Sequence, residues 1–237
     1  RRMQPALEAR LPDSQAGFCK ARGCRDNVII LKLLIDELVK ANREAVVTFV
    51  DYTAAFDSVS HRFLDEALAE ANVPPKVRRI IAAIYSTATG AVRIRQQSGE
   101  ELFSDSFSIE RGAIQGDIFS PPSFTIALDR VFRRHDIHCE GVGGPPLKCP
   151  QVSKLEYADD LGALNGTAEE ASLRLSALEH GGAAEAQLII SLKKTKAMPI
   201  RRYEAVSETV EDEVVALKLK QKCEECGRTF PTLKGLR

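Results

Sequence analysis

Two adjacent acids between short apolar runs are the feature that most constrains how this chain can fold. Residues 155–158 lead into Asp159 and Asp160, and the apolar residues among 161–164 follow them. Two short apolar runs separated by turn residues predict a β-hairpin with the acids at its tip. Taken alone, an Asp pair is also typical of a plain turn, because Asp accepts local backbone hydrogen bonds. The rest of the chain decides between these interpretations.

A third acid, Asp51, follows a run that reads as a buried strand. Residues 45–50 are apolar apart from Thr48, and the run is short enough for a strand buried on both faces. Packing does not explain an acid at the point where such a strand ends. Carboxylates that are brought together repel one another unless cations lie between them. Few, hard oxygen ligands on rigid elements suit Mg²⁺ with substrate phosphates, so the three acids indicate a polymerase-type two-metal site.

Several segments together resemble the reverse transcriptases of non-LTR (LINE-type) retrotransposons. Residues 49–59 resemble the first catalytic palm motif, 111–121 the Gln-Gly-Asp-x-x-Ser-Pro loop, 157–160 the third motif, and 192–196 the Lys-Thr-Lys end of the fourth. Residues 15–18 and 25–28 match the finger segment that precedes the palm. The resemblance runs from about Gln15 to Met198 in the order and spacing of the family. One such motif is weak evidence, but several in order are strong.

The resemblance implies an α+β fold: a right-hand polymerase palm, with an antiparallel sheet backed by helices, partial fingers and no thumb. The expected organisation is a partial fingers segment at 1–44, a palm at 45–200, and a linker with a truncated zinc finger at 201–237. The implied activity is RNA-directed DNA polymerase, with an RNA template, a DNA primer and deoxynucleoside triphosphates as partners. Two alternatives stay open: an inactive or domesticated remnant that binds nucleic acid, and an RNA-directed RNA polymerase.

The same resemblance assigns the catalytic acids. Asp51 and Asp159 are expected to bridge two Mg²⁺ ions, and Asp160 is the third member of the set. The backbone carbonyl of Tyr52 is expected as a further ligand. Phe56 follows where the family has the aromatic residue that excludes a 2′-hydroxyl, although an ordinary core aromatic is the other interpretation.

The remaining site residues come from two loops. Gln115 and Gly116 are expected to contact the incoming nucleotide and the template base, with Gly116 allowing a close backbone approach. Lys194, or its neighbour Lys193 or Lys196, is the candidate proton donor to the leaving pyrophosphate. The sequence does not choose among the three lysines.

Composition agrees with this interpretation less sharply. The chain has 237 residues, of which 44% are hydrophobic, enough for a sizeable core. Its 33 basic and 33 acidic residues cancel, which argues against a strongly basic binding face. The sequence contains no run of about 18 apolar residues, so no membrane span is expected. Without a secretory pattern, the chain is expected inside the cell, in nucleus and cytoplasm, as an internal piece of a longer protein.

The C-terminal cysteines suggest a metal of a different kind. Cys223 and Cys226 precede a Phe and a Leu as in the first part of a Cys-Cys-His-His zinc finger. The first ligating His would fall beyond Arg237, so this is half a site. Zn²⁺ is therefore expected only in a longer protein.

Periodicity predicts the other elements. Helices are expected after Asp26 as a cap, from about Lys76, from Pro122, and after the Thr167–Glu170 capping box. Strands are expected at 91–95, 103–109, 188–190 and 197–198. The expected inward-facing residues of the first two helices are Ile29, Ile30, Leu33, Leu34, Leu38, Val77, Ile80, Ile81 and Ile84.

Overall fold

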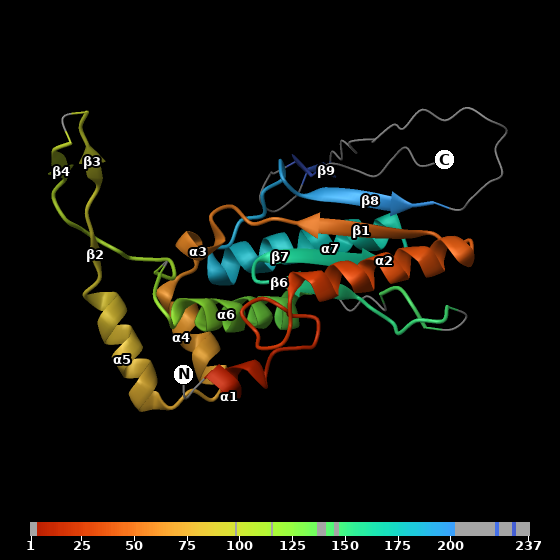
Figure 1. Cartoon of the computed structure of the whole chain (residues 1–237), viewed down its shortest axis with the longest axis horizontal. Coiled ribbons are helices and arrows are strands. Elements are labelled where there is room, and N and C mark those ends of the chain that lie inside the picture. The colour runs from red at the N-terminus through yellow and green to blue at the C-terminus, as the bar shows by residue number, and fades with distance from the viewer. Residues whose placement is uncertain are drawn as a thin grey trace.

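A four-stranded antiparallel sheet in the order β6-β7-β1-β8 organises the molecule (Figure 1). The computed structural model describes residues 4–97, 99–114, 116–136, 141–144 and 147–201, with 221–222 and 229–230. The strands of this sheet are β1 (Ala45–Val50), β6 (Lys154–Tyr157), β7 (Asp160–Asn165) and β8 (Lys196–Ile200). The expected strand ending at Asp51, the acidic hairpin and the closing strand at 197–198 are therefore confirmed.

The register between β1 and β7 brings the acid of the first catalytic motif beside the acids of the third. Val50 pairs with Leu161 on β7, so Asp51 follows β1 where Asp160 begins β7. On its other side β1 pairs with β8, where Val46 lies opposite Pro199. β8 is the outer strand of the sheet, the position where a proline without an N–H group is tolerated.

Alternation along the strands divides the apolar residues between two faces. Val50, Leu161 and Ala163 belong to the large core that includes α6 (Ser120–His135) and α7 (Ala168–Gly181). Val47, Leu155 and Leu164 belong to a smaller core with Leu34 and Leu38 of α2 (Cys24–Lys40). The sheet is thus covered by α6 and α7 on one face and by α2 on the other.

Shorter elements complete the fold around this sheet. α4 (His61–Glu70) packs against α6, where buried Arg130 pairs with Glu66 (3.0 Å) and Glu70 (3.1 Å). A π-helical turn, η1 (Gly182–Ala186), extends α7. The remaining elements are α1 (Gln4–Glu8), α3 (Ala55–Ser58), α5 (Pro75–Ser86), β2 (Thr89–Gly90), β3 (Arg93–Arg95), β4 (Glu101–Phe103), β5 (Phe107–Ser108), β9 (Gln221–Lys222) and β10 (Thr229–Phe230).

The segment 89–108, called the arm below, projects from the end of α5 (Figure 1). Within it β3 pairs with β4 and β2 pairs with β5, so the two expected strands are split into shorter ones. Ile94, Phe103 and Phe107 are all more than half exposed. The arm is built from local pairings and buries little apolar surface.

Several expectations about the helices are wrong in detail. Gly23, not Asp26, is the N-cap of α2, and the Asp26 carboxylate accepts a hydrogen bond from the Gly23 N–H (2.9 Å). The α6 helix begins at Ser120, two residues before the predicted start. Thr167 caps α7 by accepting from the Glu170 N–H (3.1 Å), but Glu170 accepts from the Gly166 N–H rather than closing the box on Thr167.

Burial also corrects two predictions. Leu34 and Leu38 face the core, but Ile29, Ile30 and Leu33 of α2, and Ile80 and Ile84 of α5, are exposed. Residues 188–190 form no strand; Ile190 makes only an isolated bridge to Tyr52. Gln187 adopts a left-handed φ of 60° directly after the π-helical turn, and the chain then runs past Tyr52 and Asp51 before it forms β8.

None of the helices in the described ranges is both long and apolar enough to cross a membrane.

Candidate active site

Three acids from two sequence motifs meet at one end of the sheet. Asp51 follows β1, Asp159 lies in the turn between β6 and β7, and Asp160 is the first residue of β7. We call these three residues the acid rim. Neighbouring strands of a sheet are about 4.8 Å apart, so the register of β1 and β7 keeps Asp51 beside Asp160.

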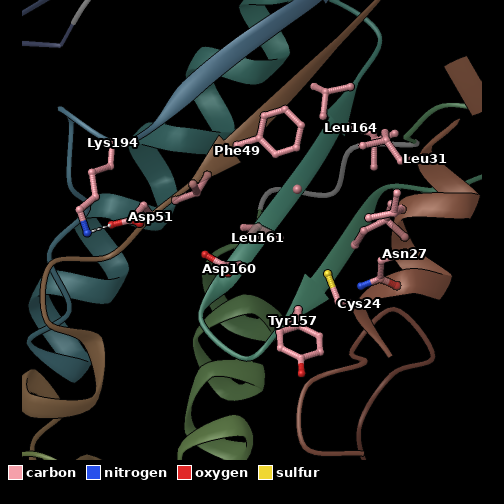
Figure 2. A pocket seen from close by; sticks show the side chains of 15 residues that line it. Cys24, Asn27, Leu31, Phe49, Asp51, Tyr157, Asp160, Leu161, Leu164 and Lys194 are labelled. Atoms are coloured by element: carbon pink, nitrogen blue, oxygen red, sulfur yellow. Dashed lines mark ion pairs between the residues drawn. The ribbon is translucent and has the colours of Figure 1, made fainter. Parts of the chain in front are cut away.

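A cavity of about 370 Å³ opens on the same end of the sheet (Figure 2). Alternation directs Phe49, Asp51, Tyr157 and Asp160 to the face that α2 covers, and all four line this cavity. The first turns of α2 form the opposite wall through Cys24, Asn27, Val28 and Leu31. Asn27 and Val28 lie in the segment 25–28 that resembles the fingers of the family, but nothing local to α2 indicates that these residues face the acids, because they meet only in the folded chain.

Asp51 is bracketed by the loop that precedes β8. The Ser191 N–H donates to the Asp51 carbonyl (2.7 Å), and the Asp51 N–H donates to Thr195 Oγ1 (3.3 Å). Lys194 lies in this loop, and its Nζ is 3.3 Å from Asp51 Oδ1 (Figure 2). Of the three candidate lysines, Lys194 is the one that pairs with an acid of the rim in the described residues.

One oxygen of Asp51 is suited to a cation. Asp51 Oδ1 is buried and, among the described residues, accepts no hydrogen bond. A buried carboxylate oxygen without a donor is costly, and a metal ion would satisfy it. The Lys194 ammonium is near but is itself 68% exposed, so it compensates only weakly. In the described part of the chain, no group of three or more His, Cys, Asp or Glu side chains is placed so that it could hold a metal ion.

The pKa of Asp159 is raised by its surroundings. Burial raises the pKa of the Asp159 carboxyl, and the charges of Asp160 and Asp51 raise it further. A backbone hydrogen bond and Lys194 oppose this shift without cancelling it. The negative charge of Asp159 is therefore disfavoured at this site, and a divalent cation bound beside it would offset that cost. Carboxylate oxygens of this kind fit Mg²⁺ when phosphate oxygens complete the coordination.

The predicted substrate residues fall into different environments. The Tyr52 phenol is buried in the large core, where burial raises its pKa, so only its backbone is near Asp51. Phe56 is half-buried and stacks on Phe124 of α6, with ring centroids 3.9 Å apart. Gly116 has a φ of 91° and is exposed, and no described atom lies within 4 Å of where its Cβ would be. Its positive φ, rather than a close approach by the protein, explains the glycine.

Gln115, Cys223 and Cys226 lie outside the described residues, so their predicted roles are not assessed by this structure.

The arrangement of the fold has known counterparts. Apo telomerase from Candida tropicalis, truncated from its C-terminal domain, superposes with a TM-score of 0.60 at 14% identity, over 87% of this chain and 40% of that one. Candida tropicalis telomerase in complex with a fragment of telomeric RNA gives a TM-score of 0.57 at 12% identity, over 98% and 36% of the two chains. The fold is that of a right-hand polymerase, as the sequence predicted.

Sequence comparison identifies the family. The reverse transcriptase (RNA-dependent DNA polymerase) family matches residues 1–221, so the chain belongs to this family. The Pol polyprotein of the type-1 retrotransposable element R2 from Nasonia vitripennis is 29% identical over 171 residues, 72% of this chain and 16% of that protein. The polyprotein of the type-2 element R2DM from Drosophila melanogaster is 30% identical over 139 residues, 56% and 13% of the two. The match thus spans about a sixth of the length of the first relative and about an eighth of the second.

Proposed function

We propose that this chain is the polymerising part of an RNA-directed DNA polymerase of a retrotransposon, which adds deoxynucleotides to a primer 3′-hydroxyl. The observation that carries the proposal is the convergence of Asp51, Asp159 and Asp160 at one rim, where Asp51 and Asp160 line an open cavity and the described neighbour of the buried Asp51 Oδ1 is the exposed Lys194 ammonium at 3.3 Å. The C. tropicalis relative in fold was solved with telomeric RNA, which supports RNA as the template.

The acids act as the metal clamp in this proposal. Asp51 and Asp159 would hold two Mg²⁺ ions, with Asp160 and the Tyr52 carbonyl nearby. When bound, such ions lower the pKa of the attacking hydroxyl and neutralise charge on the leaving pyrophosphate. The protein's own contribution is to keep the carboxylates on adjacent strands, so that little reorganisation is needed when the nucleotide arrives.

Lys194 is the proposed proton donor to the pyrophosphate. Its ammonium pairs with Asp51 and is largely exposed, so it can leave this partner for a phosphate without a large energetic cost. The Thr195 hydroxyl and the Ser191 N–H hold the loop against Asp51, which keeps the lysine within reach of the rim.

Phe56 is the proposed barrier to ribonucleotides. Its stacking on Phe124 and its edge contact with Phe18, at 6.2 Å between ring centroids, would keep the ring from yielding to a 2′-hydroxyl. The Phe56→Ala variant is expected to incorporate ribonucleotides at least about tenfold better relative to deoxyribonucleotides, because a methyl cannot exclude the hydroxyl. Equal preference in wild type and variant, or a preference of the wild type for ribonucleotides, would contradict the proposal and favour an RNA polymerase.

Primer extension on an RNA template tests the activity, with the chain carried in a polypeptide as long as its relatives. We expect extension that needs Mg²⁺ and that falls about a thousandfold or more in Asp51→Asn and Asp159→Asn, since each removes several kcal/mol of charge stabilisation. Asp36→Asn, an exposed acid on α2, is the matched control and should retain activity. Absence of extension in the wild type, with the fold intact, would favour a non-catalytic remnant.

A further inference from the structure

The N-terminal segment 14–17 lies against the strand that leads into the acidic turn. The Ala16 N–H donates to the Glu156 carbonyl (2.9 Å), and the Glu156 N–H donates to the Ser14 carbonyl (2.9 Å). These bonds make a parallel bridge between Gln15 and Glu156, which are 141 positions apart in the sequence. Asn27 Nδ2 also donates to the Glu156 carbonyl (2.9 Å). The outer edge of β6 is therefore covered by a segment from the other end of the chain.

Gln15 extends this contact to the turn itself. Its Oε1 accepts hydrogen bonds from the N–H groups of Ala158 (2.9 Å) and Gly17 (2.7 Å). Its Nε2 donates to the Ala158 carbonyl (3.3 Å). The side chain thus satisfies both polar groups of one residue's backbone, and Gln15 is only 1% exposed.

Ala158 is the residue in the turn that most needs such support. Its φ is 56°, in the left-handed region that is sterically unfavourable for a residue with a Cβ. It immediately precedes Asp159, so its backbone torsions set the direction from which both acidic side chains leave the turn. The mutual repulsion of the acids would otherwise favour a wider, more variable turn.

Only an amide side chain of this length makes both bonds. Glutamine presents an acceptor and a donor side by side, whereas an ionised glutamate only accepts and asparagine is one methylene shorter. Burial alone would require only that the Gln15 amide find some hydrogen-bond partner. It does not explain why that partner is the residue directly before Asp159, a proposed metal ligand.

We propose that Gln15 is a positioning residue for nucleotidyl transfer: its amide fixes the backbone of Ala158 and so aims Asp159 and Asp160 at the metal ions and substrate. The inference rests on the proposed function, because the acids need aiming only if they hold metal for the reaction. Gln15 itself does not touch the reacting atoms, because its amide is hydrogen-bonded to the backbone of Gly17 and Ala158.

The test compares Gln15→Met, Gln15→Glu and a control of similar burial. Asn165 is the control, since it is fully buried at the far end of β7 and donates to the carbonyls of Val46 (3.4 Å) and Ala163 (3.3 Å). Asn165→Ser removes buried hydrogen bonds without touching the turn. Three measurements are made on each protein: amide hydrogen exchange in the peptide that contains 157–160, Mn²⁺ binding by electron paramagnetic resonance, and kcat and KM for primer extension.

For Gln15→Met we expect exchange at the turn to rise at least about tenfold, Mn²⁺ affinity to fall several-fold, and kcat to fall about tenfold or more with little change in the KM for primer. Gln15→Glu keeps the acceptor oxygen, so its exchange should lie between those of wild type and Gln15→Met. Asn165→Ser should lose stability while turn exchange, Mn²⁺ affinity and kcat stay close to wild type.

The proposal is overturned if Gln15→Met and Asn165→Ser change the three quantities in equal proportion, or if exchange at the turn is the same in Gln15→Met and wild type. Should Gln15→Met not fold, the Gln15→Glu measurements decide on the same criteria. If the wild type does not extend a primer, the proposed function fails, while exchange and Mn²⁺ binding still show whether Gln15 orders the acidic turn.

Discussion

The acid rim and the arm both contain a β-hairpin, but the contacts that stabilise them differ in sequence separation. At the rim, the turn between β6 and β7 is contacted by residues 15–17, and Asp51 by residues 191–195, so each acid is fixed by a segment far away in the sequence. In the arm, β3 pairs with β4 and β2 with β5, all within residues 89–108. A site that must hold like charges together depends on long-range contacts, whereas a projecting hairpin does not.

Among variants of the acid rim and the arm, this difference predicts the largest loss of stability at Gly17. An ideal Cβ on Gly17 would overlap the backbone nitrogen of Ala158 and lie 2.8 Å from its Cα. Gly17→Ala should therefore force the segment away from the turn, lower stability by about 3 kcal/mol, and reduce primer extension beyond the loss of folded protein. Urea denaturation and extension rates measure the two effects. Gly23→Ala, where a Cβ meets only the Asp26 carboxylate at 3.8 Å, is the control and should differ little from wild type.

At the same rim, substitution of Lys194 is expected to reduce the reaction rate strongly while changing stability little. Because its ion pair with Asp51 is largely exposed, Lys194→Ala should change the free energy of unfolding by less than about 1 kcal/mol. If Lys194 donates a proton to pyrophosphate, the rate of a single nucleotide addition should fall about 10²- to 10⁴-fold. Lys193→Ala is the matched control, and an equal loss of rate in both variants would remove the special role of Lys194.

Asp159 should destabilise the metal-free protein at neutral pH. Its pKa is raised in the folded state by burial and by the neighbouring acids, so the folded chain binds this proton more tightly than the unfolded chain. Stability is then lost as pH rises from the ordinary carboxyl pKa of about 4 through the raised value, and stays lost above it.

Asp159→Asn removes that loss. In the presence of a chelator, its Tm should exceed that of wild type by a few degrees at pH 7, and the two should converge below about pH 4. Thermal unfolding monitored by circular dichroism at both pH values gives the comparison. A variant that is less stable than wild type at pH 7 would show that repulsion in the acid rim is small.

The smallest effect is expected in the arm. Phe103 is 64% exposed, so Phe103→Ala should alter the free energy of unfolding by no more than about 0.5 kcal/mol. Phe132→Ala in α6, where the ring is 2% exposed, is the matched buried substitution and should cost about 4 kcal/mol. Similar losses for the two phenylalanines would mean that the arm is buried against something else in solution.

The same contrast explains what could be predicted from sequence. The strand at 45–50 and the hairpin at 155–164 were predictable, because buried strands show as short apolar runs and a turn interrupts them. The exposed Ile29, Ile30, Ile80 and Ile84 were predicted as core, because periodicity reports an apolar face without saying whether another element covers it.

Contacts across long sequence separations escaped prediction. Gln15 was noted only as part of a segment that resembles the fingers of the family. Nothing local to residues 14–17 indicates that its amide reaches Ala158. Residues 188–190 were predicted as a strand from their apolar composition, but only Leu188 and Ile190 pack in the large core, Ile189 is exposed, and the segment makes a single bridge to Tyr52. In both cases the tertiary structure overrides the local preference.

Pro199 has a consequence for how this protein meets other chains. An outermost strand normally exposes a row of backbone donors and acceptors that a foreign strand can recognise, which is how sheets join between molecules. The pyrrolidine ring deletes one donor from β8 and adds bulk along the outermost ribbon. With residues 14–16 occupying the opposite margin at Glu156, neither border offers an easy template for intermolecular β-pairing.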